Sequence, residues 1–277
     1  MFFSVVFAAL LAVLGPAGLI AADEATITAD SMKYDPNTGN VTAAGNVHLT
    51  GSDGEVFGDS GLGSISGDNF EVHGNVRGHF NTKDGKTVNI VCASATLRGT
   101  DDTGRAITAS GGVKINRGTE NLTADTATWD ISVEKYSASG NVLGVFEAYS
   151  IDADAVSRDK HVFEARTIRK FSEHARKIDM SADRAEGLLN DKNEVTEFTA
   201  DGGVIVTMPD KRGVVTRATG KKSVYSLARG TVVLSGRATL TQAGRVLNSE
   251  NIVYFIESGR VDALGSPSIT FETDRKK

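Results

Sequence analysis

Gly45-Asn46-Val47-His48-Leu49 is the stretch that decides the fold. Two residues of the types that form turns lead into a segment in which apolar and polar side chains alternate. A period of two is typical of a β-strand that buries one face and solvates the other. The alternation recurs at Phe70-Glu71-Val72, Val113-Lys114-Ile115 and Val204-Ile205-Val206. Helical periodicity is scarce, so the sequence predicts an all-β protein.

The glycine-led stretch is one copy of an internal repeat. Its leading glycines stand at 45, 74, 111, 140, 202, 236 and 265. One interval, from Gly140 to Gly202, is about twice the others, which places a degenerate repeat between these two residues. A period of roughly 30 residues built from strands predicts stacked β-layers. The copies read Gly45-Asn46-Val47, Gly74-Asn75-Val76, Gly111-Gly112-Val113, Gly140-Asn141-Val142, Gly202-Gly203-Val204, Gly236-Arg237-Ala238 and Gly265-Ser266-Pro267.

A second motif precedes many of these glycines. It consists of an apolar residue, two small or polar residues and an acid, and we expect it to open the strand before each turn. The copies are Ile27-Thr28-Ala29-Asp30, Ile65-Ser66-Gly67-Asp68, Leu122-Thr123-Ala124-Asp125, Ile151-Asp152-Ala153-Asp154 and Met180-Ser181-Ala182-Asp183. With both motifs, each repeat holds two to four short strands.

Composition excludes several function classes. The 277 residues carry a formal net charge of −5, whereas a general nucleic-acid binder needs a basic surface. Cys92 is the only cysteine, so no intrachain disulfide can form, and its apolar surroundings predict a buried hydrophobe rather than a nucleophile. His73 and His79 lack a third metal ligand, and Asp152 and Asp154 are expected to be solvated. We therefore expect no catalytic residues, no metal site and no cofactor.

Two segments stand outside the repeat. Residues 1–22 are apolar and uncharged and end in small residues, which favours a cleaved signal peptide; the alternative is an uncleaved N-terminal anchor. Residues 158–177 contain seven Lys or Arg against three acids. The spacing of Ile168, Phe171, Ala175 and Ile178 fits a short amphipathic helix, and an irregular strand pair with a basic face fits equally well. Either structure makes this segment the best candidate for a domain boundary.

Four stretches carry a resemblance to a known family. They are residues 27–35, 39–47, 230–236 and 240–254, and they resemble the OstA-like (LptA/LptC) family of periplasmic lipopolysaccharide-transport proteins. The resemblance implies an open β-jelly roll, in which two antiparallel sheets of stacked short strands face each other. The chain is long for one such module. It is therefore one extended jelly roll, or two modules at 23–157 and 178–277 joined by the basic junction 158–177.

The resemblance also implies a function. Members of the family hold the acyl chains of lipopolysaccharide between the two sheets, carry the lipid between the inner and outer membranes, and join partners or further copies by edge-strand addition. The groove residues, chosen because they alternate with polar neighbours, are Val47, Leu49, Phe70, Val72, Val113, Ile115, Leu122, Trp129, Val204 and Val206. An aliphatic interior can also close on itself, which composition alone favours. The alternative function is therefore a secreted structural β-solenoid or surface protein that binds no lipid.

Overall fold

The computed structural model describes residues 26–51, 54–64, 69–81, 87–99, 105–130, 135–146, 149–174, 177–190, 195–209, 213–226, 228–255 and 258–271. The described chain divides into two compact units, one formed by residues 26–146 with 155–160 and the other by residues 149–154 with 161–271. The predicted signal peptide and the motif copy Ile65–Asp68 lie outside the described residues.

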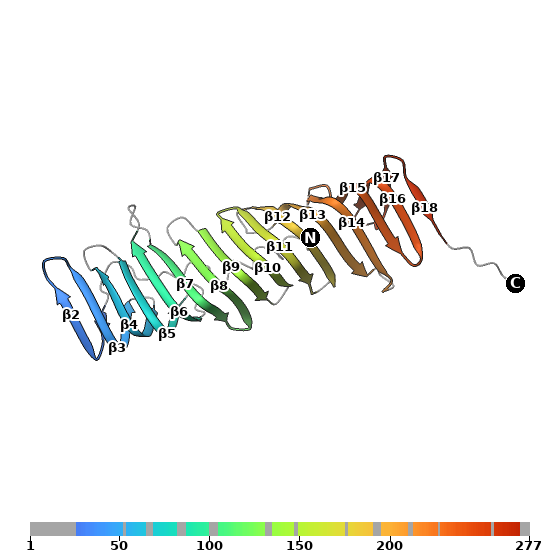
Figure 1. Ribbon diagram of the computed structural model, residues 1–277. Helices are drawn as coiled ribbons and strands as arrows, with labels where there is room; N and C mark the ends of the chain where they lie inside the picture. The colour runs from blue at the N-terminus through green and yellow to red at the C-terminus, as the bar shows by residue number, and fades with distance from the viewer. Residues whose placement is uncertain are drawn as a thin grey trace. The chain divides into compact units, whose positions relative to one another are not determined.

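All regular structure in the described residues is β-strand, which confirms the all-β prediction (Figure 1). The strands are β1 (Thr26–Thr28), β2 (Ser31–Asp35), β3 (Asn40–Gly51), β4 (Gly54–Ser64), β5 (Asn69–Asn81), β6 (Thr87–Gly99), β7 (Arg105–Arg117), β8 (Glu120–Asp130), β9 (Lys135–Val145), β10 (Tyr149–Asp159), β11 (Val162–Glu173), β12 (Ile178–Leu189), β13 (Val195–Pro209), β14 (Val215–Ser226), β15 (Thr231–Gln242), β16 (Arg245–Phe255), β17 (Val261–Leu264) and β18 (Ser268–Thr270).

Neighbouring strands pair in antiparallel fashion and in chain order. In the first unit the order runs from β3 to β9, and β1 and β2 both pair with β3. In the second unit it runs from β11 to β16, and β17 and β18 both pair with β16. Figure 1 shows these strands side by side within each unit.

Six of the seven glycine-led repeats form β-bulges in the middle of long strands, and the seventh, Gly265-Ser266-Pro267, lies between β17 and β18. Between Ala44 and Val47, β3 holds one residue more than its partner β4, and Gly45 and Asn46 both have positive φ, 75° and 48°. Glycine and asparagine accept this backbone conformation more readily than other residues. The strands are therefore longer than the period-two stretches suggested, and one repeat consists of two strands, of which only the first carries the bulge.

The degenerate repeat lies in β11. Its register shifts between Ile168 and Phe171, and Thr167 has a φ of 50°. The apolar inward side chains of β11 are Phe163, Ala165, Ile168 and Phe171. The extra residue of the bulge changes their spacing from two to three, which imitates the spacing of a helix. The helical interpretation of this basic segment is therefore wrong for residues 162–173, and the strand alternative is correct there.

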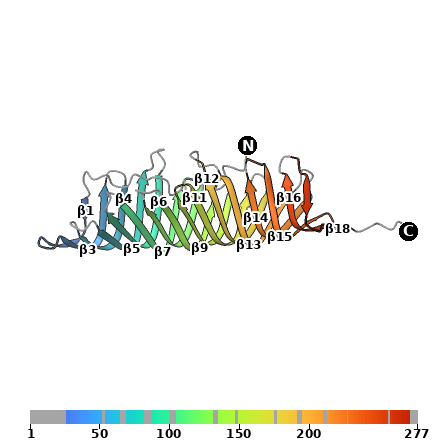
Figure 2. The ribbon, with the colours of Figure 1, turned by 90° about the horizontal axis from the view of Figure 1, so that it is seen from above.

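Each bulged site bends the sheet, so that the two halves of every strand form two facing layers (Figure 2). In the first unit we call these layers the first and second arms. The first arm comprises residues 47–51, 54–58, 76–81, 87–92, 113–117, 120–124 and 142–145; the second comprises residues 40–44, 60–64, 69–73, 94–99, 105–110, 126–130 and 135–139. The core lies between the arms.

In the second unit, a core cluster is formed by Ala218, Leu234, Ala238 and Ile252. Leu234 and Ala238 lie on either side of the β15 bulge at Gly236-Arg237, so both halves of that strand contribute to the core. Leu240, Leu247 and Val261 pack against this cluster but are only partly buried. The two halves of the strands therefore enclose an apolar interior here as well.

Candidate functional site

The inward faces of the strands hold all ten predicted groove residues. Alternation along each strand directs them to the same side as the core, and the register pairs two of them, Ile115 and Leu122, directly. Phe70 and Val206 are half-buried. The other eight are buried: Val47, Leu49, Val72, Val113, Ile115, Leu122, Trp129 and Val204. The structure thus brings the first eight of the ten together in the first unit and places Val204 and Val206 in the second.

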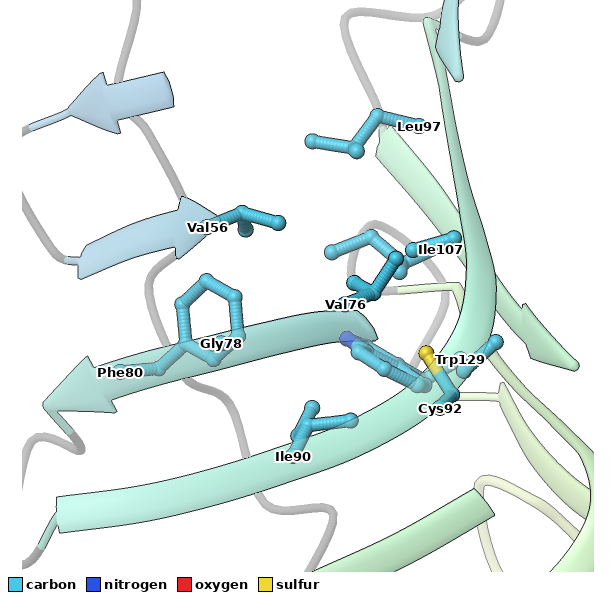
Figure 3. Close-up of a pocket in the computed structure, with 11 residues that line it drawn as sticks. Val56, Val76, Gly78, Phe80, Ile90, Cys92, Leu97, Ile107 and Trp129 are labelled. Carbon is cyan, nitrogen blue, oxygen red and sulfur yellow. The ribbon is translucent and has the colours of Figure 1, made fainter. Parts of the chain in front are cut away.

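The two inward faces of the first unit meet around a small apolar cavity. Figure 3 shows Val56, Phe80 and Ile90 from the first arm pointing toward the same space as Ile107 and Trp129 from the second. The cavity volume is about 20 Å³, little more than the space that one water molecule needs. The two arms are therefore closed against each other around these residues, and an acyl chain could enter there only if the arms separated.

Glycines of β4 leave the space that aromatic rings of β5 fill. An added Cβ would lie 2.5 Å from Cδ2 of Phe70 at Gly63, and 2.4 Å from Cδ1 of Phe80 at Gly54. Such contacts are far shorter than van der Waals distance, so the rings lie directly on the backbone of β4. This packing explains why the interior is closed with few aromatic residues. The four glycines at positions 54, 58, 61 and 63 were its signal in the sequence, which the motif search missed.

An acidic side chain covers each Gly-Asn bulge of the first unit. The Nδ2 groups of Asn46, Asn75 and Asn141 donate hydrogen bonds to Oδ2 of an aspartate on the preceding strand or turn, at 2.9, 2.8 and 3.2 Å. The three acceptors are Asp30, Asp59 and Asp125, each 15 positions before the glycine of its bulge.

These hydrogen bonds give the acid of the second motif a structural role. At Gly45 and Gly140 an added Cβ would lie 2.3 and 2.2 Å from Oδ2 of the covering aspartate, Asp30 and Asp125 respectively. The glycine is thus required by the close approach of the carboxylate as well as by its positive φ. Asp59 does not fit the motif, because Phe57, one of the two residues between Val56 and Asp59, is neither small nor polar, and the sequence search missed it.

At the β11 bulge, Arg169 makes the hydrogen bonds to aspartates that asparagine makes at the Gly-Asn bulges. Its Nε donates to Oδ1 of Asp152 at 2.6 Å, its Nη1 donates to Asp154, and its Nη2 donates to the carbonyl of Ala153 at 3.0 Å. The hydrogen bond from Arg169 lowers the pKa of the Asp154 carboxyl below its ordinary value. Asp152 and Asp154 are therefore paired with a cation, whereas the sequence predicted only that water solvates them.

The residues considered as a nucleophile or as metal ligands are buried or contact neighbouring side chains. Cys92 is buried, and its desolvation raises the pKa of the thiol, so the thiolate is disfavoured. His73 and His79 lie on opposite sides of the Gly74-Asn75 bulge. Nε2 of His73 lies 3.3 Å from Oε2 of Glu71, and Nδ1 of His79 lies 2.7 Å from Oδ1 of Asn89. Within the described ranges, no three His, Cys, Asp or Glu residues form a group that could hold a metal ion.

The interior is more accessible at the end strands than in the middle. Met32 and Tyr34 of β2 pair with the inward residues Ala43 and Val41, yet they are 44% and 56% exposed. Ile269 of β18 pairs with the partly buried Leu247 and is 59% exposed. In the part of the chain that the structure describes, β2 and β18 each have a partner on one side only, so both present pairable edges.

A family model matches residues 93–260 of this sequence; its description is LptA/(LptD N-terminal domain) LPS transport protein. The matched region covers more than half of the chain. The chain belongs to this lipopolysaccharide-transport family. The match begins within β6 and ends before β17, so it includes the bulges of β7 and β13. It also includes six of the ten predicted groove residues, four in the first unit and two in the second. The family is one of transport proteins.

A solved structure with similarity to this member of the LptA/LptD N-terminal family is that of LptH from Pseudomonas aeruginosa. LptH is described as the LptA-homologous periplasmic component of the lipopolysaccharide transport device. The alignment covers 56% of this chain and 95% of LptH, with 16% sequence identity and a TM-score of 0.32. A search of curated proteins returned no match. Among the described residues, no helix is long and apolar enough to cross a membrane.

Proposed function

We propose that this protein carries lipopolysaccharide between the inner and outer membranes by holding its acyl chains between the two halves of its strands. The observation that supports this most is an unbroken, uncharged row along the inward face of the second arm. This row comprises Ala43, Gly61, Val72, Ala95, Ala109, Ala127 and Ala138. Burial of an acyl chain stabilises a complex by about 0.8 kcal/mol per CH₂ group. Binding of a long chain thus needs no reaction and no cofactor.

The second unit offers the easier entry for an acyl chain. Leu240 and Leu247 face inward beside Ala218 but are only partly buried. In the first unit the corresponding positions are buried, and the cavity there is about 20 Å³. A chain that enters beside Leu240 and Leu247 displaces fewer contacts than one that must part the closed arms. We propose that loading begins at these residues.

Photocrosslinking tests the proposed entry. A photoreactive amino acid at Leu247, which faces inward, is expected to crosslink to lipopolysaccharide in cells. The matched control is the adjacent Asn248, which is exposed and pairs with Thr239 and Ser268 on the outward face. Equal crosslinking at both positions, or none at Leu247, would contradict lipid binding between the strand halves.

Partners are proposed to add at the exposed edges of β2 and β18. Strand addition would cover the apolar side chains of Met32, Tyr34 and Ile269 and would continue the inward face into the next molecule. We expect reversible end-to-end association, or association with inner- and outer-membrane transport proteins. Light scattering over a concentration series checks self-association, and a strictly monomeric protein at high concentration would count against it.

The closed interior of the first unit favours a second candidate function, that of a secreted structural β-protein that binds no lipid. The two candidates differ in the crosslinking result at Leu247. LptH is a periplasmic component, and we propose the same location for this protein, with residues 1–22 as signal peptide or anchor. The division into modules at 158–177 also stays a proposal. N-terminal sequencing of the protein from its native host separates signal peptide from anchor.

A further inference from the structure

The outward face of the first arm carries a polar hollow that the transport function does not use. Its volume is about 820 Å³, and it is formed by β1, β3, β4 and β5. The residues that line it are Thr28, Asn46, Val47, His48, Phe57, Gly58, Asp59, Asn75, Arg77 and His79. Apart from Val47 and Gly58, these side chains alternate with inward residues, so the hollow lies on the opposite side of the sheet from the proposed lipid-binding interior.

An aromatic stack holds two histidines in this hollow. The ring of His48 lies parallel to that of Phe57, with 4.1 Å between the centroids, and the ring of His79 meets Phe57 edge-on at 6.2 Å. Nε2 of His48 also lies 3.0 Å from Oε2 of Glu55. These contacts fix both imidazoles beside the phenyl ring. Nδ1 of His79 also lies 2.7 Å from Oδ1 of Asn89, so the ring nitrogens outside these two hydrogen bonds are Nδ1 of His48 and Nε2 of His79.

Arg77 is the charged group of the hollow that lacks a partner in the described structure. It pairs in register with Phe57 on one side and Val91 on the other, and neither can accept a hydrogen bond from its side chain. The two nearby acids have other partners: Glu55 contacts His48, and Asp59 accepts a hydrogen bond from Asn75 at 2.8 Å. Among the described residues, no carboxylate lies within ion-pair distance of Arg77. Its fork of N–H donors is therefore available to an anion.

We propose that this hollow binds a phosphate monoester group, with Arg77 as the main ligand and with Nδ1 of His48 and Nε2 of His79 as additional contacts. A guanidinium binds two phosphate oxygens at once, in a geometry that a lysine cannot reproduce. A hollow of this volume also has room for the sugar or glycerol that bears the phosphate. The shared chemistry is the phosphate group, whether its source is a soluble sugar phosphate or a lipid headgroup.

Nuclear magnetic resonance of the full mature protein tests the site. Inorganic phosphate and glucose 6-phosphate are expected to shift the side-chain signals of Arg77, His48 and His79 in a saturable manner, and glucose alone is expected to leave them unchanged. Arg77→Gln should weaken phosphate binding at least about tenfold, because it removes charge-assisted hydrogen bonds. The control Arg217→Gln removes an exposed positive charge from β14 in the other unit and should leave phosphate binding unchanged.

Vesicles distinguish the two sources of phosphate. Binding to phosphatidylcholine vesicles only when they contain phosphatidic acid, and loss of that binding in Arg77→Gln, would assign the site to a lipid headgroup. Binding of glucose 6-phosphate without vesicle binding would assign it to a soluble ester. Absence of a saturable shift with any phosphate compound, or equal binding by Arg77→Gln and the unmodified protein, would overturn the proposal. None of these results depends on whether the interior binds acyl chains.

Discussion

Replacing Val113 by Asp is expected to lower the free energy of unfolding by at least about 3 kcal/mol, because the new carboxylate would be buried without a partner. Val113 is 1% exposed on the inward face of β7 and pairs in register with Ala124. Urea unfolding measures the change. Lys114→Asp is the matched control, because the adjacent Lys114 is exposed and points outward, so its replacement should cost less than about 1 kcal/mol.

Val206→Asp should be milder, although Val206 also faces inward. Val206 is half-buried and pairs with Met180 and Ala218 in the second unit, so a carboxylate there keeps part of its hydration. We expect it to cost less than half as much as Val113→Asp. Equal losses for the two variants would mean that the second unit is as closed as the first, and the proposed entry beside Leu240 and Leu247 would be wrong.

Gly140→Ala is expected to destabilise the protein by about 2–4 kcal/mol. The left-handed backbone, with φ 76°, costs a non-glycine residue about 1–2 kcal/mol. The added Cβ would also lie 2.2 Å from Oδ2 and 2.6 Å from Cβ of Asp125, so the covering strand must shift. Gly112→Ala is the control, because φ is 67° there and no atom lies within 4 Å of the added Cβ. It should show only the backbone cost.

A double-mutant cycle separates the two costs at Gly140. Asp125→Gly removes every atom that the new Cβ would meet on that side chain, including Cβ. If the close approach is the cause, Gly140→Ala should cost at least about 1 kcal/mol less in the Asp125→Gly background. Equal costs in both backgrounds, or a Gly112→Ala variant as unstable as Gly140→Ala, would contradict the role assigned to the aspartate.

The sequence predicted the β class, the inward positions and the location of the missing repeat. Alternation around Val47 and Val113 reports burial directly, because a strand with one buried face has a period of two. The leading glycines report bulges, but the motif does not distinguish a bulge within a strand from a turn between two strands. That distinction depends on which neighbour pairs with the residues before and after Gly45. For this reason the strands proved longer than the alternating stretches.

Other features depend on contacts between strands, which one sequence does not contain. The inward spacing of Ile168 and Phe171 looked helical because the bulge adds a residue between them. The hydrogen bonds from Arg169 to Asp154 and Asp152 join residues that are 15 and 17 positions apart in the sequence. The hollow around Arg77 combines four strands. At Arg169 and at Arg77 the residues are ordinary surface types, and only the register of the sheet brings their neighbours beside them.

The measurement that tests lipid binding most directly is the amount of lipopolysaccharide that purifies with the protein, determined by mass spectrometry. It should be compared for the unmodified protein, Val206→Asp and Ile205→Asp, because Ile205 precedes Val206 and faces outward between Ser181 and Thr219. We predict that Val206→Asp loses most of the bound lipid while remaining folded, and that Ile205→Asp retains it. Equal amounts in both variants, or no lipopolysaccharide with the unmodified protein, would contradict acyl-chain binding between the strand halves.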